Sequence, residues 1–388
     1  MRKISVGIVV FCLLISVYTV YAPEPERVIV VFEETTDLNV LTQYEANIEH
    51  VFEFIPAAVV TISPSAKQAL SLDSNIEYIQ TDHYRQYVSP PPASISAPSA
   101  SLTPTSQVIP WGVDRIDADL AWSHSTGDGV KVGIIDTGID RDHPDLVANI
   151  HGGFNTIAPT PQYPDPEDFE DDHGHGTHCA GIVGAVDNTF GVIGVAPDAW
   201  LYGIKAFDSS GSGYTSDCVE AIEWCIKNEM QVISMSWGSY SDDPVLHKIC
   251  NVAEKYGIVL VAAAGNEGYY TPDLYPAAYS SVMAISATNS SDNLPWWSNY
   301  GTEIELAAPG VNIYSTYLGG GYAYMSGTSM ACPHVSGTAA LVIEVYPMWA
   351  NITVRGILCK TAEDLGAPGW DPYYGYGLVD AEAAAWYY

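Results

Sequence analysis

The chain has 388 residues, of which 46 are acidic and 14 are Lys or Arg, and its formal net charge is −32. With 47% hydrophobic and 15% charged residues, it is a core-forming protein, long enough for one large domain and a smaller one, and not a disordered chain. The acidic balance argues against a surface for nucleic acids or anionic membranes, which needs clustered Lys and Arg. It suits cation binding, a salt-rich environment or simply a solvated acidic surface.

The N-terminus has the features of a secretory signal. Arg2 and Lys3 precede an uncharged apolar run at 4–21, and Ala22 supplies a small residue at the cleavage point. We expect residues 1–22 to be removed on export. An uncleaved N-terminal anchor is the alternative, because the run is long enough to span a bilayer. No later segment has this length and apolarity, so we expect a secreted protein without stable membrane association.

Residues 23–88 predict a small α+β module that is marginally stable by itself. The expected strands are 27–33, 57–62 and 76–79, and the expected helices are 41–50 and 65–72. The segment 89–106 is rich in Pro, Ser and Ala and shows no apolar periodicity. It predicts an extended, flexible linker.

Residues 107–388 alternate between apolar strands and helices. The expected strands are 130–135, 200–205, 232–235, 259–263 and 282–287, and the expected helices are 178–186, 216–228, 245–255 and 335–345. This alternation predicts an α/β fold, a mainly parallel sheet flanked by helices on both faces. In such sheets, active groups gather at the carboxyl ends of the strands.

Four polar residues stand at such positions. Asp136 and Asn266 each follow an apolar strand, whereas His175 and Ser329 each lie close to a helix start. His175 could take the proton of Ser329, with Asp136 supporting the imidazolium. Asn266 and the backbone N–H of Ser329 could bind an oxyanion. Taken singly, a serine near a helix start is usually a cap and an asparagine after a strand is usually a turn residue.

The histidines and cysteines leave further possibilities open. The spacing of His175 and His178 could bind zinc, but no HExxH motif is present, and His178 is expected to pack in the core. Six cysteines lie outside the signal without a CxxC pair, which argues against a zinc or thioredoxin-type site. Cys218 or Cys225 could reach Cys250 on a neighbouring helix, and the sequence does not settle the pairing.

The four polar residues lie in distinctive motifs: IIDTGID around Asp136, HGTHCAG around His175, AAAGNEG around Asn266 and GTSMACPH around Ser329. In this order they resemble the subtilisin-type serine proteases, from residue 107 to about 385, and the module at 23–88 is similar to the family's propeptide. The resemblance implies a subtilisin-like fold and a serine endopeptidase acting on proteins or peptides through an acyl-enzyme. Its catalytic residues would be Asp136, His175 and Ser329, with Asn266 in the oxyanion hole. The propeptide would act as chaperone and inhibitor until the chain cuts itself, near Tyr87 and Val88 or in the linker up to Ser106.

The same resemblance implies a substrate cleft. The two walls of its pocket would be Ser236, Trp237 and Gly238 and Ala263, Ala264 and Gly265. Gly211, Ser212 and Gly213 would form the edge that pairs with an extended substrate. Trp237 stands where family members often have Leu, which leaves the depth of the pocket open. Glu267 at its base either accepts Lys or Arg of a substrate or is a solvated carboxylate.

Structural calcium is implied as well. The tight loop would use Gln107, Asp145, Val186, Asn188, Phe190 and Val192, and a weaker cation site would use the carbonyls of Ala277, Tyr279 and Val282. Oxygen ligands with few charges suit calcium. The acidic insert 165–172 could add an ion, although a charge run is usually a solvated loop.

The sequence therefore predicts a secreted, calcium-stabilised, monomeric serine endopeptidase. The alternatives are a processing protease of narrow specificity and a non-catalytic binding module. Cys179 could confer sensitivity to mercurials if it lies under His175, and Asn289 and Asn351 begin glycosylation sequons.

Overall fold

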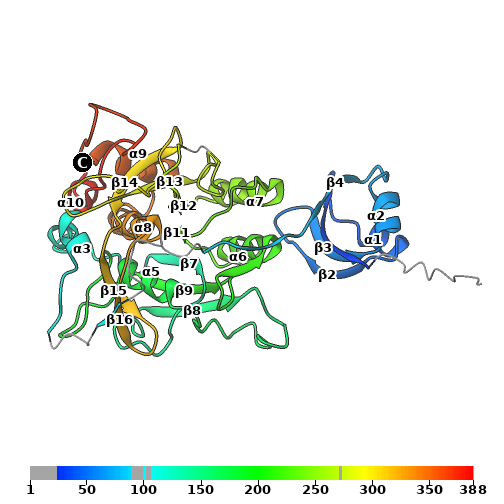
Figure 1. The fold of residues 1–388 in the computed structure, drawn as a ribbon, viewed down its shortest axis with the longest axis horizontal. Helices are drawn as coiled ribbons and strands as arrows, with labels where there is room; N and C mark the ends of the chain where they lie inside the picture. Colours follow the sequence, from blue (N-terminus) through cyan, green and yellow to red (C-terminus); the bar gives the residue numbers. More distant parts are fainter. Residues whose placement is uncertain (1–23, 89–98, 102–105, 271–272, 388) are drawn as a thin grey trace, which may run out of the picture.

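The computed structural model describes residues 24–88, 99–101, 106–270 and 273–387. The predicted signal lies outside these residues. The chain forms a small N-terminal module and a large α/β body, which meet at a narrow junction (Figure 1).

The module is a four-stranded antiparallel sheet with two helices on its outer face (Figure 1). The sheet order is β2-β3-β1-β4. Its elements are β1 (Glu26–Phe32), α1 (Leu38–Gln43), β2 (Asn47–Val51), β3 (Ala57–Ile62), α2 (Pro64–Leu70) and β4 (Ile76–Thr81). Alternate residues of the strands serve two cores. For example, Val28 and Val30 face the helices, whereas Ile29 and Val31 face the body.

The predicted helix at 41–50 is wrong. Helix α1 ends at Gln43, and Glu45 then takes a left-handed conformation with φ of 55°. This turn reverses the chain into β2, whose exposure alternates along the strand because one of its sides faces solvent. Pairing with β3 therefore prevails over the weak helical pattern.

The body is built on a seven-stranded parallel sheet of order β14-β13-β12-β11-β7-β9-β8. The strands are β7 (Lys131–Asp136), β8 (Ile150–Asn155), β9 (Trp200–Lys205), β11 (Val232–Met235), β12 (Val259–Ala263), β13 (Met283–Thr288) and β14 (Ile304–Pro309). The central strands β7, β11 and β12 are mostly apolar and almost fully buried, because both faces of the sheet are covered. The α/β fold predicted from the sequence is confirmed.

Helices cover the two faces unequally. Core residues of one face pack with α3 (Trp111–Arg115), α4 (Ala118–Ala121), α5 (His175–Gly184), α8 (Thr328–Val345), α9 (Asn351–Thr361) and α10 (Ala381–Ala385). The other face packs with α6 (Thr215–Lys227) and α7 (Pro244–Lys255). Almost every residue of α8 is buried, as expected for the central helix of a large domain.

The module docks on α6 and α7 through the open face of its sheet (Figure 1). The Glu223 carboxylate of α6 accepts hydrogen bonds from the backbone N–H groups of Glu53 and Phe54, at 2.5 and 2.7 Å. The side chain of Gln80 donates to Asp243, which also caps α7. An apolar face that would otherwise be exposed to water is thus buried, and backbone donors at its edge are satisfied.

Beyond β4 the chain runs onto the body. Strand β5 (Tyr84–Gln86) pairs antiparallel with β10 (Ser212–Tyr214). Strand β6 (Ser99–Ser101) joins the hairpin of β15 (Ile313–Tyr317) and β16 (Gly321–Met325). Residues 99–101 lie in the predicted extended linker, and their pairing with β16 is one that no local sequence pattern reveals.

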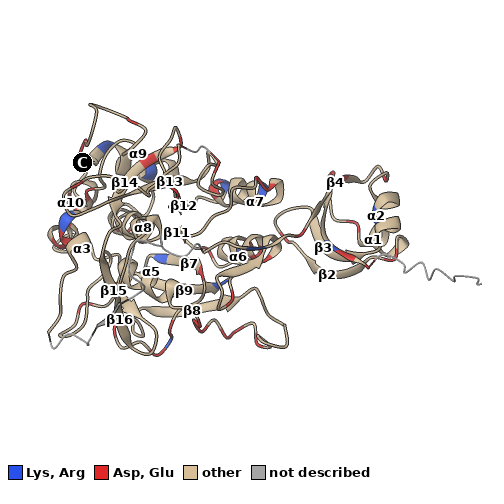
Figure 2. Cartoon of the chain, in the orientation of Figure 1, with Lys and Arg blue, Asp and Glu red and all other residues tan. Residues whose placement is uncertain are grey.

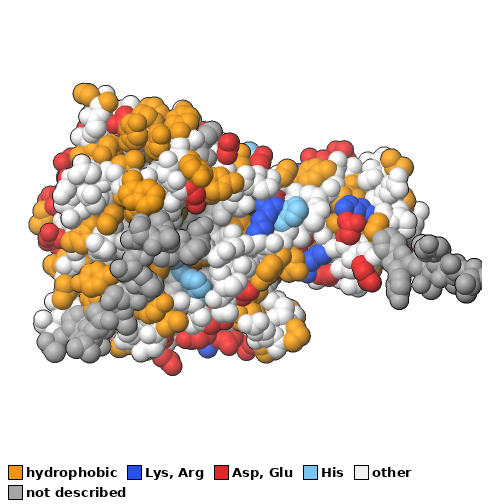
Figure 3. Space-filling model, in the orientation of Figure 1, with side chains coloured by type: hydrophobic (Ala, Val, Ile, Leu, Met, Phe, Trp, Pro, Cys, Tyr) orange, Lys and Arg blue, Asp and Glu red, His pale blue; other side chains and the backbone are white. Residues whose placement is uncertain are grey.

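Acidic side chains are spread over the module and the body, and basic side chains are few and scattered (Figure 2). On the face seen in Figure 3, apolar side chains gather where α9 and β14 lie. Among the described residues, no helix combines the length and apolarity needed to cross a bilayer.

Candidate active site

Asp136 and His175 meet at the carboxyl end of the sheet. Asp136 ends β7 and is completely buried, and His175 is the first residue of α5. Nδ1 of His175 lies 2.8 Å from Oδ1 and 3.0 Å from Oδ2 of Asp136. The backbone N–H of Thr137 donates to Oδ1 at 2.7 Å and holds the carboxylate in place. Gly176 lets the start of α5 lie close to the chain that follows β7, because a Cβ at Gly176 would lie 2.1 Å from the Gly138 carbonyl oxygen.

The serine stands on the first turn of α8. The carbonyl of Ser329 has no helical donor, because the residue four positions on is Pro333, which lacks an N–H. Ser236 Oγ and Cys179 Sγ donate to this carbonyl instead, at 2.8 and 3.4 Å. The Ser329 hydroxyl donates to the Ser236 carbonyl at 3.1 Å. Cys179 Sγ also lies 3.9 Å from His175 Nδ1, so one thiol contacts both the histidine and the serine segments.

The side-chain amide of Asn266 has a defined orientation. Its Oδ1 accepts from the backbone N–H of Thr328 at 2.8 Å and from the Thr328 hydroxyl at 3.0 Å. Nδ2 is therefore the end that can donate to a ligand. A Cβ at Gly327 would lie 3.5 Å from Asn266 Nδ2 and 3.6 Å from the backbone nitrogen of Ser329. The two predicted oxyanion donors thus flank one small space, next to a residue without a side chain.

The predicted cleft walls face the chain that leaves the module. Gly211 accepts from the N–H groups of Tyr87 and Val88 at 3.0 and 3.1 Å, and the N–H of Gly238 donates to the Tyr87 carbonyl at 3.2 Å. The Tyr87 ring packs against Phe207 and Trp237, with centroids 5.3 and 5.6 Å away. Trp237 therefore forms the side of a pocket for Tyr87.

A small cavity of ≈ 20 Å³ lies between Tyr87 and Ser329. It is lined by Tyr87, Ser236, Trp237, Gly238, Ala263, Gly265, Asn266, Glu267, Leu274, Thr328 and Ser329. Most of the predicted wall residues are in this set, and Ala264 instead supports the neighbouring turn through its carbonyl.

Glu267 does not point freely into the cavity. Its Oε2 accepts from the backbone N–H of Asn266 and from Asn299 Nδ2, both at 2.9 Å, and from the Tyr240 hydroxyl. Neither alternative expected from the sequence describes this carboxylate, which ties together the turn that carries Asn266.

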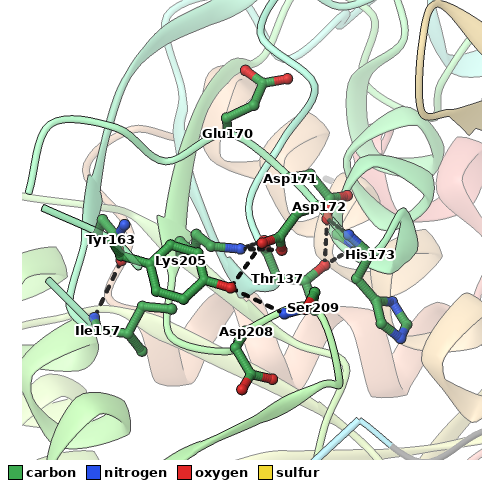
Figure 4. A network of polar contacts seen from close by, with 12 residues as sticks. Thr137, Ile157, Tyr163, Glu170, Asp171, Asp172, His173, Lys205, Asp208 and Ser209 are labelled. Carbon is green, nitrogen blue, oxygen red and sulfur yellow. Dashed lines mark hydrogen bonds and ion pairs between the residues drawn. The ribbon is translucent and has the colours of Figure 1, made fainter. Parts of the chain in front are cut away.

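A buried lysine supports the other side of the site (Figure 4). Lys205 ends β9 with only 1% of its surface exposed, and Nζ donates to the Thr137 carbonyl and to Asp172, both at 2.6 Å. The Tyr163 hydroxyl donates to the same Asp172 carboxylate at 2.8 Å. The ammonium thus joins the residue after Asp136 to the loop that leads into His175.

The acidic insert is engaged within the protein. Arg141 pairs with Asp168 and Glu170 at 3.0 and 3.1 Å. Asp171 accepts from the N–H groups of Gly174 and Thr177 at 2.9 Å each, at the start of α5. Asp168, Glu170 and Asp171 of the insert therefore have partners within the protein.

The predicted calcium loop fits a calcium ion. Asp145 is buried and lies 2.7 Å from the Asn188 amide, and Gln107 Nε2 lies 2.8 and 3.3 Å from the carbonyls of Val186 and Val192. The two side-chain amides place nitrogens against these oxygens. Rotated by half a turn, Gln107 would present its oxygen to the same centre, as a calcium ion requires. The same rotation of Asn188 would give up the hydrogen bond that its Oδ1 accepts from the Phe190 N–H at 2.8 Å, in exchange for a metal ligand.

The weaker cation site does not fit an ion. The guanidinium of Arg355 donates to the carbonyls of Ser280 and Val282, at 2.9 and 3.4 Å, and forms an ion pair with Glu305. A protein cation already lies against the Val282 carbonyl, beside the segment of Ala277 and Tyr279. A metal ion would meet this positive charge, so we propose none there.

The structure shows the environment of His178 and of the three cysteines that were considered for a disulfide. His178 is buried between the carbonyls of Ile313 and Ala323, and burial lowers its pKa to about 3. This is the core histidine expected from the sequence. Cys218, Cys225 and Cys250 are buried free thiols, so the disulfide considered for Cys250 is not formed.

Several supporting residues were not identified from the sequence. Thr328 lies in the serine motif without an assigned role, and Lys205 gave only the signal of a charge ending an apolar strand. Asn299 gave none, because its partners stand about 30 positions earlier in the chain.

Comparisons with known proteins show the family of the chain. Residues 127–377 match the model of the subtilase family (Peptidase_S8). The chain is 41% identical to an alkaline protease of Alkalihalobacillus alcalophilus over 91% of this chain and 85% of that protein. It is 39% identical to subtilisin amylosacchariticus of Bacillus subtilis subsp. amylosacchariticus over 89% and 85%. It is 37% identical to the minor extracellular protease Epr of Bacillus subtilis (strain 168) over 93% and 54%. The chain belongs to the subtilase family and is a subtilisin-like serine endopeptidase.

Proposed function

We propose that this endopeptidase is exported as a precursor, uses Asp136, His175 and Ser329 as its triad, and matures by cutting itself behind the N-terminal module. His175 takes the proton of Ser329 as the hydroxyl attacks the peptide carbonyl, and Asp136 stabilises the imidazolium. Asn266 Nδ2 and the N–H of Ser329 donate to the oxyanion. The proton then passes from His175 to the leaving amine, and water hydrolyses the acyl-enzyme.

The observation that carries the proposal is the position of residues 84–88 in the cleft. They pair with β10, and Tyr87 occupies a pocket of the body, as an extended substrate would. The module thereby blocks the site that it precedes. We infer that it is the propeptide and an inhibitor of its own chain.

The cut follows Val88 in this arrangement. The Tyr87 carbonyl accepts from Gly238, whereas the carbonyl under attack must face Asn266 and Ser329. The residues that follow Val88 in the sequence belong to the linker. We therefore place the cleavage between Val88 and Gln107, rather than between Tyr87 and Val88.

Calcium at the Asp145 and Asn188 loop completes the proposal. The ion would add positive charge to a chain of net charge −32 and would hold Gln107 at the start of the body against its loop. We further propose a secreted monomer, which light scattering of the matured enzyme would test.

The test of self-maturation compares the wild-type chain with Ser329→Ala, expressed separately and characterised by intact mass and N-terminal sequencing. The wild type should yield a fragment beginning between residues 89 and 107, and the variant should keep its module. A wild type that retains the module, or a variant that matures alone, contradicts self-cleavage. Hydrolysis of a peptide library by the matured form then distinguishes broad from narrow specificity, and an inert matured form would indicate a binding module.

A further inference from the structure

The turn that carries Asn266 is folded around one side chain. Asn299 lies in the loop between β13 and β14 and is completely buried. Its backbone N–H donates to the Gly265 carbonyl at 3.0 Å. A buried amide needs partners for its oxygen and for both hydrogens, and most of those for Asn299 come from this turn.

The contacts bracket Asn266 on both sides. Asn299 Oδ1 accepts from the backbone N–H groups of Glu267 and Tyr269, at 3.2 and 3.0 Å. Asn299 Nδ2 donates to the Ala264 carbonyl and to Glu267 Oε2, both at 2.9 Å. Other bonds also hold the turn: the N–H groups of Ala264 and Gly268 donate to the carbonyls of Ile285 and Trp297, at 3.0 and 2.7 Å. The Asn299 side chain adds bonds to residues on both sides of Asn266.

The fit is specific for asparagine. Gly265 has φ of 99°, and a Cβ there would lie 2.3 Å from Asn299 Nδ2, so the turn passes directly over the amide. Alanine would leave the turn N–H groups and the Ala264 carbonyl unpaired. Aspartate would turn an acceptor toward the Ala264 carbonyl and the Glu267 carboxylate.

Glu267 connects the side chain of Asn299 to the backbone of Asn266. Glu267 Oε2, which Asn299 fixes, accepts from the backbone N–H of Asn266 at 2.9 Å. The surface residue Tyr240 reinforces this point, because its hydroxyl donates to Glu267 and accepts from Asn299 Nδ2 at 2.8 Å. Thr328 thus orients the side-chain amide of Asn266, and Asn299 orients its backbone.

We propose that Asn299 is a positioning residue for the oxyanion hole, acting through Asn266. This rests on the proposed role of Asn266 as oxyanion donor. Loss of one such donor lowers kcat by about 10²–10³. A displaced donor retains part of this effect, so Asn299→Ala should lower kcat about tenfold. KM should change less than kcat, because strand β10, which pairs with the extended segment 84–86, lies outside this turn.

The test is a double-mutant cycle on the matured enzyme, produced from the full-length precursor. The concentration of active sites is determined by titration with a sulfonyl fluoride. The probe is a peptide p-nitroanilide with an aromatic residue before the anilide. Asn266→Ala, Asn299→Ala and the double variant are compared with wild type. If Asn299 acts through Asn266, its substitution should have no further effect on kcat in the Asn266→Ala background.

Two results overturn the proposal: wild-type kcat in Asn299→Ala, or the same fold-loss in both backgrounds. If Asn266→Ala itself keeps wild-type kcat, the proposed oxyanion role fails and the positioning role fails with it. These outcomes are distinguishable, since the first two leave the Asn266 effect intact.

Two further variants separate positioning from folding. Asn149 is also buried, and its amide donates to the carbonyls of Gly184 and Pro197 at 2.9 and 2.5 Å, outside the oxyanion turn. Asn149→Ala should lower Tm and keep the kcat of titrated sites. Tyr240→Phe removes only a hydroxyl at the surface and should fold even if Asn299→Ala does not. It should lower kcat two- to fivefold in the wild-type background and not in Asn266→Ala, and any other pattern argues against the proposal.

Discussion

The pKa of His175 is set by opposing influences. Burial disfavours the imidazolium, but the Asp136 carboxylate and the neighbouring Cys179 outweigh it, so the pKa of His175 is raised well above its usual value. A general base must be neutral to accept a proton. The contact that is proposed to stabilise the imidazolium during the reaction should therefore also move the working range of the free enzyme toward alkaline pH.

We expect kcat/KM to rise with pH as His175 loses its proton, with a midpoint above the ordinary value of about 6.5. Asp136→Asn should lower the midpoint, because it removes the carboxylate charge, and should lower kcat by about 10⁴-fold. A pH–rate profile of the matured enzyme with a peptide anilide measures both quantities. A wild-type midpoint at or below 6.5 would contradict the raised pKa.

The thiol of Cys179 predicts slow inactivation by mercuric ions. It contacts both His175 and the Ser329 carbonyl, so a bound mercury atom would displace the base. Burial raises the pKa of Cys179, and reaction should therefore be gradual rather than immediate. Cys179→Ala should resist inactivation, whereas Cys359→Ser, which removes a partly exposed thiol, should remain sensitive. Equal inactivation rates for wild type and Cys179→Ala would argue against this.

At the scale of elements, the sequence predicted best what is buried on both faces. Strands 200–205, 232–235 and 259–263 match β9, β11 and β12 to the residue, because continuous apolar runs have few other places in a soluble fold. Strand β8 was missed because it contains two glycines, and β6 because its partner β16 lies far along the chain.

The sequence predicted part of the candidate site, as it predicted part of the fold. Strand ends and helix starts located Asn266 and the residues of the proposed triad. The side chains that hold these groups depend on distant contacts, such as those of Asn299 with 264–269 and of Arg355 with Val282. No spacing within one element encodes such contacts.

The calcium loop yields a prediction for stability. Calcium in excess should raise the Tm of the matured enzyme by roughly 5–10 °C, since binding at one hundred times Kd adds about 2.7 kcal/mol. Asn188→Ala should reduce this shift, because it removes one oxygen ligand. Differential scanning calorimetry with calcium and with EGTA measures the effect. An unchanged wild-type Tm would count against calcium in this loop.

At the scale of the whole molecule, the junction between module and body is ionisable. His50 of β2 lies 3.6 Å from Glu220 and 3.8 Å from Glu223 of α6, with Phe52 and Arg27 close by. Burial opposes the charge on His50, but Glu223 and Glu220 outweigh it and raise the pKa of His50. Burial also raises the pKa of Glu220, to about 7. A cavity of ≈ 860 Å³ lined partly by His50 and Glu220 gives water access to these groups.

Protonation of His50 should therefore hold the module in place. Because the pKa of His50 is raised on docking, its stabilisation of the docked module is complete below the pKa of a free histidine. This stabilisation is lost as the pH rises through the pKa that His50 has in the docked module. After self-cleavage, we expect the module to leave faster at pH 9 than at pH 6, as measured by gel filtration over time. His50→Ala should flatten this dependence. Faster release of the wild-type module at acid pH would contradict the assignment.

If the precursor cuts itself as proposed, the pairing of β5 with β10 also determines the kinetic order of that first cleavage. Since residues 84–88 are already in the cleft, the linker bond meets Ser329 at an effective concentration set by a short tether, of the order of millimolar. The first turnover is then unimolecular. Its rate should not change when the precursor is diluted a thousandfold, and a peptide added from solution should delay it only above millimolar levels.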